Sequence, residues 1–314
     1  MRASFPTAVT MGVLPLAAKA HGVEGDIERA AFLASTLDRR WRDDAPFHLI
    51  VVSPSADIGA TANALCPTPR IQIDLRTEEA FFGPRDAFHS LPGWWKQQII
   101  KLVVPAVLRI GPYLTFDADV ACVQDIDGRT FIRDGKLVSQ WYRQYKNGWW
   151  AATSRLLGLP YEPSSFGFDV TPNVLHSDIA ARVLWQLALM GLGIGAPKTR
   201  IVPRLVRRKA TRRLYCWYEE AQARARAGEV IHEDTWTEYA LYMLLAGDGL
   251  HRLHVRPSDD MPLLAHSHSI WFSAERQRLD HYTPATRPGA PFAVLQSTSG
   301  ISQAEVKAAV GRLP

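Results

Sequence analysis

Two aspartates separated by a single residue, Asp117 and Asp119, have the type and spacing to bind a metal ion. They follow the apolar run 113–116, and such a run ending at acids is typical of a buried strand whose tip reaches solvent. Alternate residues of an extended segment point the same way, so both carboxylates can face one ligand. Close carboxylates repel unless a cation lies between them, and their hard oxygen atoms suit Mg²⁺ or Mn²⁺. The pair therefore predicts a divalent metal that holds a diphosphate, with a solvated turn as the alternative.

The elements that must position this pair alternate between strands and helices. Apolar runs predict strands over residues 8–16, 47–53 and 70–75, and helical spacing predicts a helix opening at Gly25-Asp26 and another over 93–108. Pro105 should kink or break the second helix. The alternation predicts an α/β layer with a largely parallel sheet, which binds ligands at the carboxyl ends of its strands. Residues 1–20 also imitate a secretory signal, but the interruption at Pro15 favours the strand.

The second half of the chain predicts shorter and more mixed elements. Asp134-Gly135 is typical of the turn of a hairpin, here over 131–138. Helices are expected over 142–157, 172–189, 236–245 and 303–313, and strands over 166–170, 263–272 and 293–297. The strand over 263–272 would carry His266 and His268 on one face.

Composition indicates a globular protein with a sizeable core. The chain has 314 residues, of which 47% are hydrophobic, enough for one large domain or two closely joined ones. Ten tryptophans and a charged fraction of 21% argue against disorder. Three widely spaced cysteines suit a reducing compartment, with thiols that mostly pack in the core. No stretch is long enough for a transmembrane helix.

The net charge of +5 is concentrated between residues 198 and 213, where there is no acid. A solvated helix face is the default interpretation, and an anionic membrane surface or a phosphorylated substrate is the second. Nucleic acid is not expected, because no recognised binding motif accompanies the run. The basic residues are Lys198, Arg200, Arg204, Arg207, Arg208, Lys209, Arg212 and Arg213.

The order of these features resembles that of GT-A-fold glycosyltransferases, in which a β/α half ending in hydrophobic–D-x-D precedes a mixed half with a late histidine. More closely, the chain is similar to a bacterial glycosyltransferase-like family of largely uncharacterised function, associated with surface-polysaccharide genes. The matching segments together span nearly the whole chain. They are GDIERAAFLASTL, GWWKQQIIKL, YLTFDADVACVQDI, FDVTPNVLHSD, WTEYALY and FAVLQSTSGI.

This resemblance implies an α/β fold of the GT-A type in a single domain. A Rossmann-type nucleotide-sugar-binding half with a mixed sheet (1–127) would be fused to a smaller acceptor half (128–314) that ends in a metal-ligand segment. The implied activity is metal-dependent glycosyl transfer from a nucleotide-sugar to a glycan or lipid-linked acceptor in surface polysaccharide synthesis. The implied location is the cytoplasm, with peripheral contact at the inner membrane through residues 198–213.

The resemblance also assigns roles within the metal site. It makes Asp119 the direct ligand of Mn²⁺ or Mg²⁺, and Asp117 its partner, which reaches the ribose or the metal's waters. In that fold a late histidine often completes the metal shell, which implies His266 or His268. For either histidine, a packed or surface position is the alternative.

Other residues are expected around the donor and the acceptor. An inverting transferase needs a carboxylate to deprotonate the acceptor hydroxyl, and Glu238 or Asp234 could serve, unless they are surface-helix acids. Lys101 and Gln98 (with Gln97) lie on the helix before the D-x-D strand and are expected to line the donor site. Asp26, at the first loop-to-helix junction, suits an N-cap or a contact with the nucleotide.

Three other classes of protein use related features. A haloacid-dehalogenase-type phosphatase places its D-x-D in the first strand and follows it with Thr or Val where this chain has Ala121. A sugar-1-phosphate nucleotidyltransferase needs a Gly-rich basic signature after the first strand, which is missing here. A carbohydrate-binding or scaffold protein of the same fold stays open, and metal-dependent hydrolysis of nucleotide-sugars would distinguish it from the enzyme.

Overall fold

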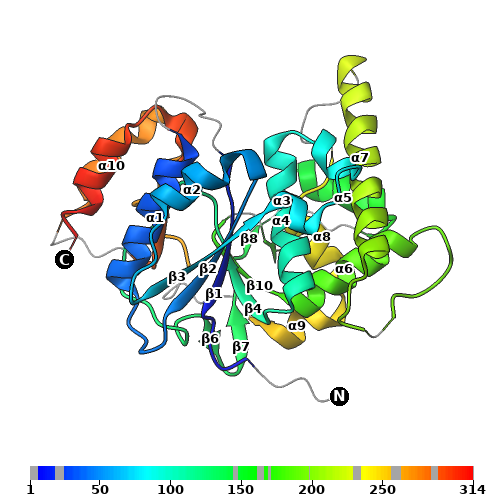
Figure 1. Ribbon diagram of the computed structural model, residues 1–314, viewed down its shortest axis with the longest axis horizontal. Coiled ribbons are helices and arrows are strands. Elements are labelled where there is room, and N and C mark those ends of the chain that lie inside the picture. The colour runs from blue at the N-terminus through cyan, green and yellow to red at the C-terminus, as the bar shows by residue number, and fades with distance from the viewer. Residues whose placement is uncertain are drawn as a thin grey trace.

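The structure, a computed structural model, describes residues 6–17, 25–143, 148–160, 166–168, 171–197, 199–228, 235–255, 263–283 and 289–313. It has the expected α/β fold: a mixed sheet lies in the middle, with α1 (Asp26–Arg40) and α10 (Gln303–Val310) on one side. On the other side lie α4 (Gly93–Leu108), α6 (Ser177–Leu189) and α7 (Arg204–Arg226) (Figure 1).

The remaining elements are shorter. The other helices are α2 (Ile58–Ala64), α3 (Glu78–Phe81), α5 (Gly148–Leu157), α8 (Glu238–Ala246) and α9 (Asp248–Leu253), with 3₁₀ turns η1 (Ser55–Asp57), η2 (Ala87–Ser90), η3 (Ser273–His281) and η4 (Ser297–Ser299). The strands of the main sheet are β1 (Met11–Pro15), β2 (Phe47–Ser53), β3 (Ile71–Thr77), β4 (Pro112–Thr115) and β10 (Asn173–His176). The others are β5 (Val120–Cys122), β6 (Ile132–Arg133), β7 (Lys136–Val138), β8 (Tyr142–Arg143), β9 (Phe166–Gly167), β11 (His254–Val255) and β12 (Phe292–Val294).

The main sheet is largely parallel, as the alternation predicted. Its order is β10-β4-β1-β2-β3, in which β4, β1, β2 and β3 are parallel and β10 runs antiparallel at the edge. The chain starts in β1, proceeds outward through β2 and β3, and then returns to the other side of β1 as β4. The strand order therefore reverses between β1 and β4, and ligands of open α/β sheets bind at such a point.

Each face of the sheet has its own apolar core. On one face, Leu33 and Leu37 of α1 pack with Leu49 of β2 in a cluster of buried side chains. On the other, α4, α6, α7 and α8 form a larger cluster that includes Val103, Leu184 and Trp236. The sheet is thus covered on both sides, as a parallel sheet requires.

Three predicted elements are wrong in whole or in part, because pairing with distant segments decided the local structure. Residues 173–176, expected to lie in a helix, form β10, whose Val174 pairs with Leu114 of β4, and residues 142–143, expected to begin a helix, form β8. Residues 263–272, expected to form a strand, contain a turn over 266–268 between the isolated bridges Leu264–Phe292 and Ile270–Leu295. By contrast, the hairpin at Asp134-Gly135 is confirmed, with positive φ at both residues.

The C-terminal segment is joined to the chain just after the D-x-D pair. β12 pairs antiparallel with β5, and the backbone N–H of Leu295 donates to the carbonyl oxygen of Asp119 at 2.8 Å. Residues about 175 positions apart in the sequence are therefore held side by side at the carboxyl end of β4.

The three cysteines are unpaired, but two of them do not pack in the core. Cys66 and Cys216 are exposed and only Cys122 is buried, so the expectation of mostly packed thiols is wrong. Burial raises the pKa of the Cys122 thiol to about 12, which keeps it protonated.

Helix α4 continues through Pro105, so the predicted break is wrong, whereas the kink given as its alternative stays a prediction. Proline has no N–H, so it leaves the carbonyl of Lys101, four residues earlier, without its helical donor. The buried hydroxyl of Tyr113 donates to that carbonyl at 2.8 Å. A side chain of β4 thereby pairs the carbonyl that Pro105 leaves free in α4, and it fixes the helical turn that carries Lys101.

We expect Tyr113→Phe to lower the free energy of unfolding by roughly 1–2 kcal/mol, because it leaves a buried carbonyl unsatisfied. Pro105→Ala supplies the missing N–H, so the loss from Tyr113→Phe should be smaller in the Pro105→Ala background. Urea unfolding of the four proteins of this double-mutant cycle measures the coupling. Equal losses in both backgrounds would contradict the proposed pairing.

Candidate functional site

The D-x-D pair follows the carboxyl end of β4, in the turn that leads to β5. β4 adjoins β1 at the reversal of strand order, and the N–H of Phe116 donates to the carbonyl of Val13 at 2.9 Å. The side chain of Asp117 is 37% exposed. The two carboxylates therefore lie where the sheet topology favours ligand binding.

The pair opens into a cavity of about 180 Å³ that gathers several of the residues expected from sequence. Gln98, Lys101, Asp117, Asp119 and Glu238 all line it. They come from α4, from the turn after β4 and from the first residue of α8.

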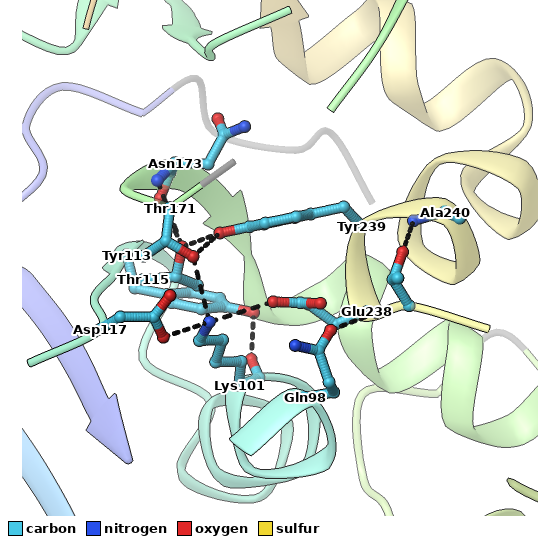
Figure 2. A network of polar contacts seen from close by, with 11 residues as sticks. Gln98, Lys101, Tyr113, Thr115, Asp117, Thr171, Asn173, Glu238, Tyr239 and Ala240 are labelled. Carbon is cyan, nitrogen blue, oxygen red and sulfur yellow. Dashed lines mark hydrogen bonds and ion pairs between the residues drawn. The ribbon is translucent and has the colours of Figure 1, made fainter. Parts of the chain in front are cut away.

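Lys101 lies at the centre of the site (Figure 2). Its side chain is 1% exposed, and its Nζ lies 2.7 Å from Oδ1 of Asp117 and 3.1 Å from Oε1 of Glu238. It also donates to the hydroxyl of Thr171 at 3.1 Å. One ion pair with Asp117 and hydrogen bonds to Glu238 and Thr171 thus surround the ammonium group, so Lys101 positions the two acids. The sequence predicted that Lys101 lines the donor site. A direct contact between its Nζ and the donor would require Lys101 to release Asp117 or Glu238.

The charges in this cluster stabilise one another. Burial by itself lowers the pKa of Lys101, but the carboxylates of Asp117 and Glu238 more than offset it and raise that pKa above the ordinary value. Burial raises the pKa of Glu238, an effect that Lys101 opposes and Asp117 reinforces. The ammonium stays charged, whereas the buried Glu238 carboxyl holds a proton more readily than an exposed one.

Hydrogen bonds fix the start of α8 against α4 and β4. The backbone N–H of Glu238 donates to Oε1 of Gln98 at 3.1 Å, so the Gln98 amide oxygen positions the helix that carries Glu238. The hydroxyl of Tyr239 lies 2.7 Å from that of Thr115 and 3.0 Å from that of Thr171 (Figure 2). Helix α8 is thereby held in place on both sides of Lys101.

Asp119 lies deeper among other charged groups. Its Oδ2 accepts from the N–H of Ser297 at 3.3 Å. Burial raises the pKa of Asp119 to about 6, the charge of Asp117 adds to the rise, and Ser297 and the buried guanidinium of Arg29 oppose it. The negative charge of the Asp119 carboxylate is therefore less well stabilised by its surroundings than that of an ordinary surface aspartate.

Asp26 lies at the start of α1, but it does not cap the helix. The helix begins at Asp26 itself, and the N-cap position is Gly25, so the N-cap interpretation is wrong. The negative charge of Asp26 contributes to the raised pKa of Asp119, which places it beside the same site. The suggested contact with a nucleotide stays a prediction.

A divalent metal fits the donor set of this cavity. Within the described ranges, no group of three or more His, Cys, Asp or Glu side chains is placed to hold a metal. Mg²⁺-type ions, however, commonly bind one or two carboxylates and take waters and substrate phosphates as the other ligands. Asp117 and Asp119 supply such a pair, and the raised pKa of Asp119 is the sign of a carboxylate that a cation would stabilise.

The late histidines are not among the residues that line the cavity, so their assignment as metal ligands stays a prediction. His268 is buried, with Nδ1 3.0 Å from the hydroxyl of Ser267 and Nε2 3.1 Å from the carbonyl of His281. Both ring nitrogens are thus engaged, while His266 is exposed. The prediction placed them on one face of a strand, and the turn over 266–268 removes that alternation. Asp234 lies outside the described residues.

Tryptophans form a part of the site that the sequence analysis missed. Trp94, Trp149 and Trp271 line the cavity, and the rings of Trp94 and Trp149 have centroids 5.5 Å apart. Trp94 is 41% exposed, although it is a large apolar side chain. The adjacent pairs Trp94-Trp95 and Trp149-Trp150 were an available signal, since one side chain of each pair cannot share the buried face of its helix with the other.

Fold and site together define an α/β protein whose carboxylate-lined, tryptophan-lined cavity lies at the switch point of its sheet. Residues 8–313 match the family described as "Family of unknown function (DUF6492)", and the chain belongs to this family. None of the curated proteins matches the chain.

We expect Asp119→Asn to stabilise the metal-free protein near pH 7.5 by about 1–2 kcal/mol, because the folded-state pKa of about 6 lies above the ordinary aspartate value of 3.8. Folding therefore favours the protonated carboxyl, and its contribution to stability is lost as the pH rises through 6. The gain should disappear below pH 4, where the carboxyl is protonated in both states.

Chemical unfolding at pH 3.5 and pH 7.5 measures this difference. Asp125→Asn is the matched control, for which we expect a change in the free energy of unfolding of opposite sign. Hydrogen bonds and charges from Arg42 and Arg40 outweigh the effect of burial and lower the pKa of Asp125, so its loss should destabilise at pH 7.5. A destabilised Asp119→Asn protein at pH 7.5 would contradict the electrostatic account of Asp119.

Proposed function

We propose that this protein is a divalent-metal-dependent glycosyltransferase, which moves a sugar from a nucleotide-sugar donor to a glycan or lipid-linked acceptor. The observation that carries the proposal is the pair Asp117 and Asp119 at the switch point of the sheet, lining a cavity with more acids than bases. The acids Asp26, Asp117, Asp119 and Glu238 act there against Arg29 and Lys101. Its role in surface polysaccharide synthesis and its cytoplasmic location are proposed from the resemblance alone.

The excess of negative charge supports a bound Mn²⁺ or Mg²⁺. Glycosyl transfer leaves a nucleoside diphosphate, and a metal stabilises the growing negative charge on that leaving group. Of the two carboxylate oxygens of Asp117, Oδ1 contacts Lys101, and Oδ2 forms no hydrogen bond or ion pair with a described residue and is left for a ligand. Asp119 is the deeper member of the pair and Asp117 the more accessible one, which fits their assignment as direct ligand and partner.

The tryptophans supply a surface for the sugar or the base. Trp94 and Trp149 present large apolar faces beside the carboxylates, and such faces pack against nucleobases or the C–H face of a sugar ring. Polar groups at one end and aromatic groups at the other would orient a ligand across the cavity.

Glu238 is the candidate general base for an inverting reaction. It lines the cavity, and burial raises the pKa of its carboxyl toward the range in which a base works efficiently. Its carboxylate would take the proton of the acceptor hydroxyl as that oxygen attacks the sugar. The contact with Lys101 fixes its orientation for this step.

A carbohydrate-binding protein without turnover is the second candidate, and the size of the cavity favours it. About 180 Å³ is less than the roughly 300 Å³ at which ligand pockets usually begin. A single sugar ring between the tryptophans would fit this volume better than a whole nucleotide-sugar. A haloacid-dehalogenase-type phosphatase is disfavoured, since the D-x-D follows β4 and not the first strand.

A thermal-shift screen of nucleoside diphosphates and nucleotide-sugars, with and without Mn²⁺, tests the proposal. Ligands that bind the folded state raise the melting temperature by mass action, so the best stabiliser identifies the donor class. Hydrolysis of that nucleotide-sugar in the presence of Mn²⁺ then separates the enzyme from a binding protein.

We expect Asp119→Asn to weaken Mn²⁺-dependent binding of the nucleoside diphosphate at least about tenfold, because a carboxylate ligand becomes a neutral amide. Affinity should also fall as the pH drops below 6 in the parent, because a ligand must be deprotonated to bind metal. Calorimetry measures both effects. His266→Ala is the control and should bind like the parent. Equal affinity of Asp119→Asn and the parent would refute the metal site.

We expect Glu238→Gln to lower the rate of transfer roughly 10²-fold or more with little change in donor affinity, because the amide cannot accept a proton. Thr171→Val removes the hydroxyl contact of Lys101 but keeps the Glu238 carboxylate, so it serves as the matched control. Initial rates and donor affinity are measured for each protein. Equal rates for Glu238→Gln and the parent would exclude Glu238 as the base.

A further inference from the structure

The segment between α6 and α7 and the first turn of α7 expose several large apolar side chains. Other large apolar side chains that are exposed in the described residues, such as Leu159 and Phe272, occur singly along the chain. Contiguous exposed apolar groups of this kind mark binding surfaces. Here the exposed fractions are 56% for Leu192, 62% for Ile194, 61% for Ile201 and 63% for Leu205.

The basic run on the same segment divides into two groups. Some of its cations are used by the fold. Arg207 donates to the carbonyl of Phe81 at 2.9 Å, Arg213 donates to that of Met190 at 2.7 Å, and Arg200 forms an ion pair with Asp178 at 2.9 Å. These three are held by the protein itself, and Lys198 lies outside the described residues.

The other four cations point outward. Arg204, Arg208 and Arg212 recur every four residues and so share one face of α7, with Lys209 beside them. All four are exposed, and none of them forms an ion pair with a described residue. Arg208 acts on the carboxyl of Asp86 and Arg212 lies over the ring of Tyr215, but neither contact is an ion pair, so most of this positive charge faces solvent.

Two of the apolar side chains and all four cations line two adjoining hollows. A hollow of about 440 Å³ is lined by Arg85, Arg204, Leu205 and Arg208, together with Asp86 and the loop around Gly83. A second hollow shares Leu205 and Arg208 with the first and extends to Leu192 and Arg212. Figure 1 shows α7 at the outer edge of the helical layer, on the side of the molecule away from α10.

We propose that this docking surface, meaning the four exposed apolar and four exposed cationic side chains, binds the surface of an anionic phospholipid bilayer. Aliphatic side chains enter the boundary between headgroups and acyl chains, while Lys and Arg attract lipid phosphates. Single-stranded nucleic acid is typically bound with aromatic stacking, which these aliphatic side chains do not supply. Of the helices in the described part of the chain, none has the length and apolar content to cross a bilayer, so the contact is peripheral. This inference is independent of the proposed glycosyl transfer.

Co-sedimentation of the full chain with vesicles tests the proposal. The probes are vesicles of phosphatidylcholine alone and of phosphatidylcholine with 30% phosphatidylglycerol. The parent should sediment with the anionic vesicles at low salt, and much less with the neutral ones. Binding should weaken as salt shortens the Debye length to roughly 8 Å and below.

Two variants separate the contributions of charge and apolar contact. Arg204→Gln, Arg208→Gln, Lys209→Gln and Arg212→Gln together should reduce partitioning onto anionic vesicles at least about tenfold, since each cation contributes about fivefold or less. Leu192→Ser, Ile194→Ser, Ile201→Ser and Leu205→Ser together should also weaken partitioning, but leave its salt dependence in place. Circular dichroism verifies that each variant is folded.

A charge-matched control removes three arginines and one lysine that are exposed on other parts of the chain. It combines Arg39→Gln, Arg70→Gln, Arg129→Gln and Lys307→Gln, and it should bind like the parent. Equal recovery of the parent with neutral and anionic vesicles would overturn the proposal. So would an equal loss in the control, which would indicate general attraction to net charge. A shift from dimer to monomer in the serine variant, without loss of vesicle binding, would assign the apolar patch to self-association instead.

Discussion

The buried ammonium of Lys101 is the interaction on which the rest of the site depends. It joins α4 to Asp117 after β4, to Glu238 at the start of α8 and to Thr171 before β10. A buried cation without partners is strongly unfavourable, so these segments must converge whenever Lys101 is inside the protein. Pro105 and Tyr113 add to this constraint, because the carbonyl of Lys101 itself is bonded to β4. Backbone and side chain of one residue thus fix the distance between α4 and the strand that carries the D-x-D pair.

This arrangement leaves the site with a deficit of positive charge. One ammonium is shared by Asp117 and Glu238, and Arg29, a second cation that acts on Asp119, donates from one guanidinium nitrogen to the carbonyl of Leu295. Asp119 accordingly keeps a raised pKa that no described neighbour fully corrects. The deficit supports a metal ion as part of the working protein, and it does so independently of any resemblance between sequence segments. It also explains why the two proposed ligands differ. One oxygen of Asp117 contacts Lys101, whereas Asp119 forms no hydrogen bond or ion pair with a described side chain.

Local patterns in the sequence predicted the parts of the fold that depend on local physics. The run 47–53 is β2, the spacing over 93–108 is α4, and the D-x-D pair lies at a strand tip. The errors have a common physical cause, which is contact between distant segments. Residues 173–176 become a strand because β4 offers an edge to pair with, and His266 and His268 lose their common face because the bridges to 292 and 295 enclose a turn. Lys101 and Glu238 were each named as site residues, but their ion pair spans 137 positions and no periodicity encodes it.

The basic run also shows that composition alone does not predict which side chains contact the rest of the protein. From the sequence alone, the default interpretation of the eight basic residues was one solvated helix face. In the structure, the basic residues of α7 point in different directions. Arg207 and Arg213 turn inward and donate to carbonyl oxygens at the ends of α3 and α6, so their charge serves the fold. Arg204, Arg208, Lys209 and Arg212 are exposed and form no ion pair with a described residue, and aliphatic side chains are exposed beside them. Repulsion between the charges and exposure of the apolar groups both oppose the isolated state. A partner that is at once anionic and apolar relieves both, and the boundary of a phospholipid bilayer has that combination.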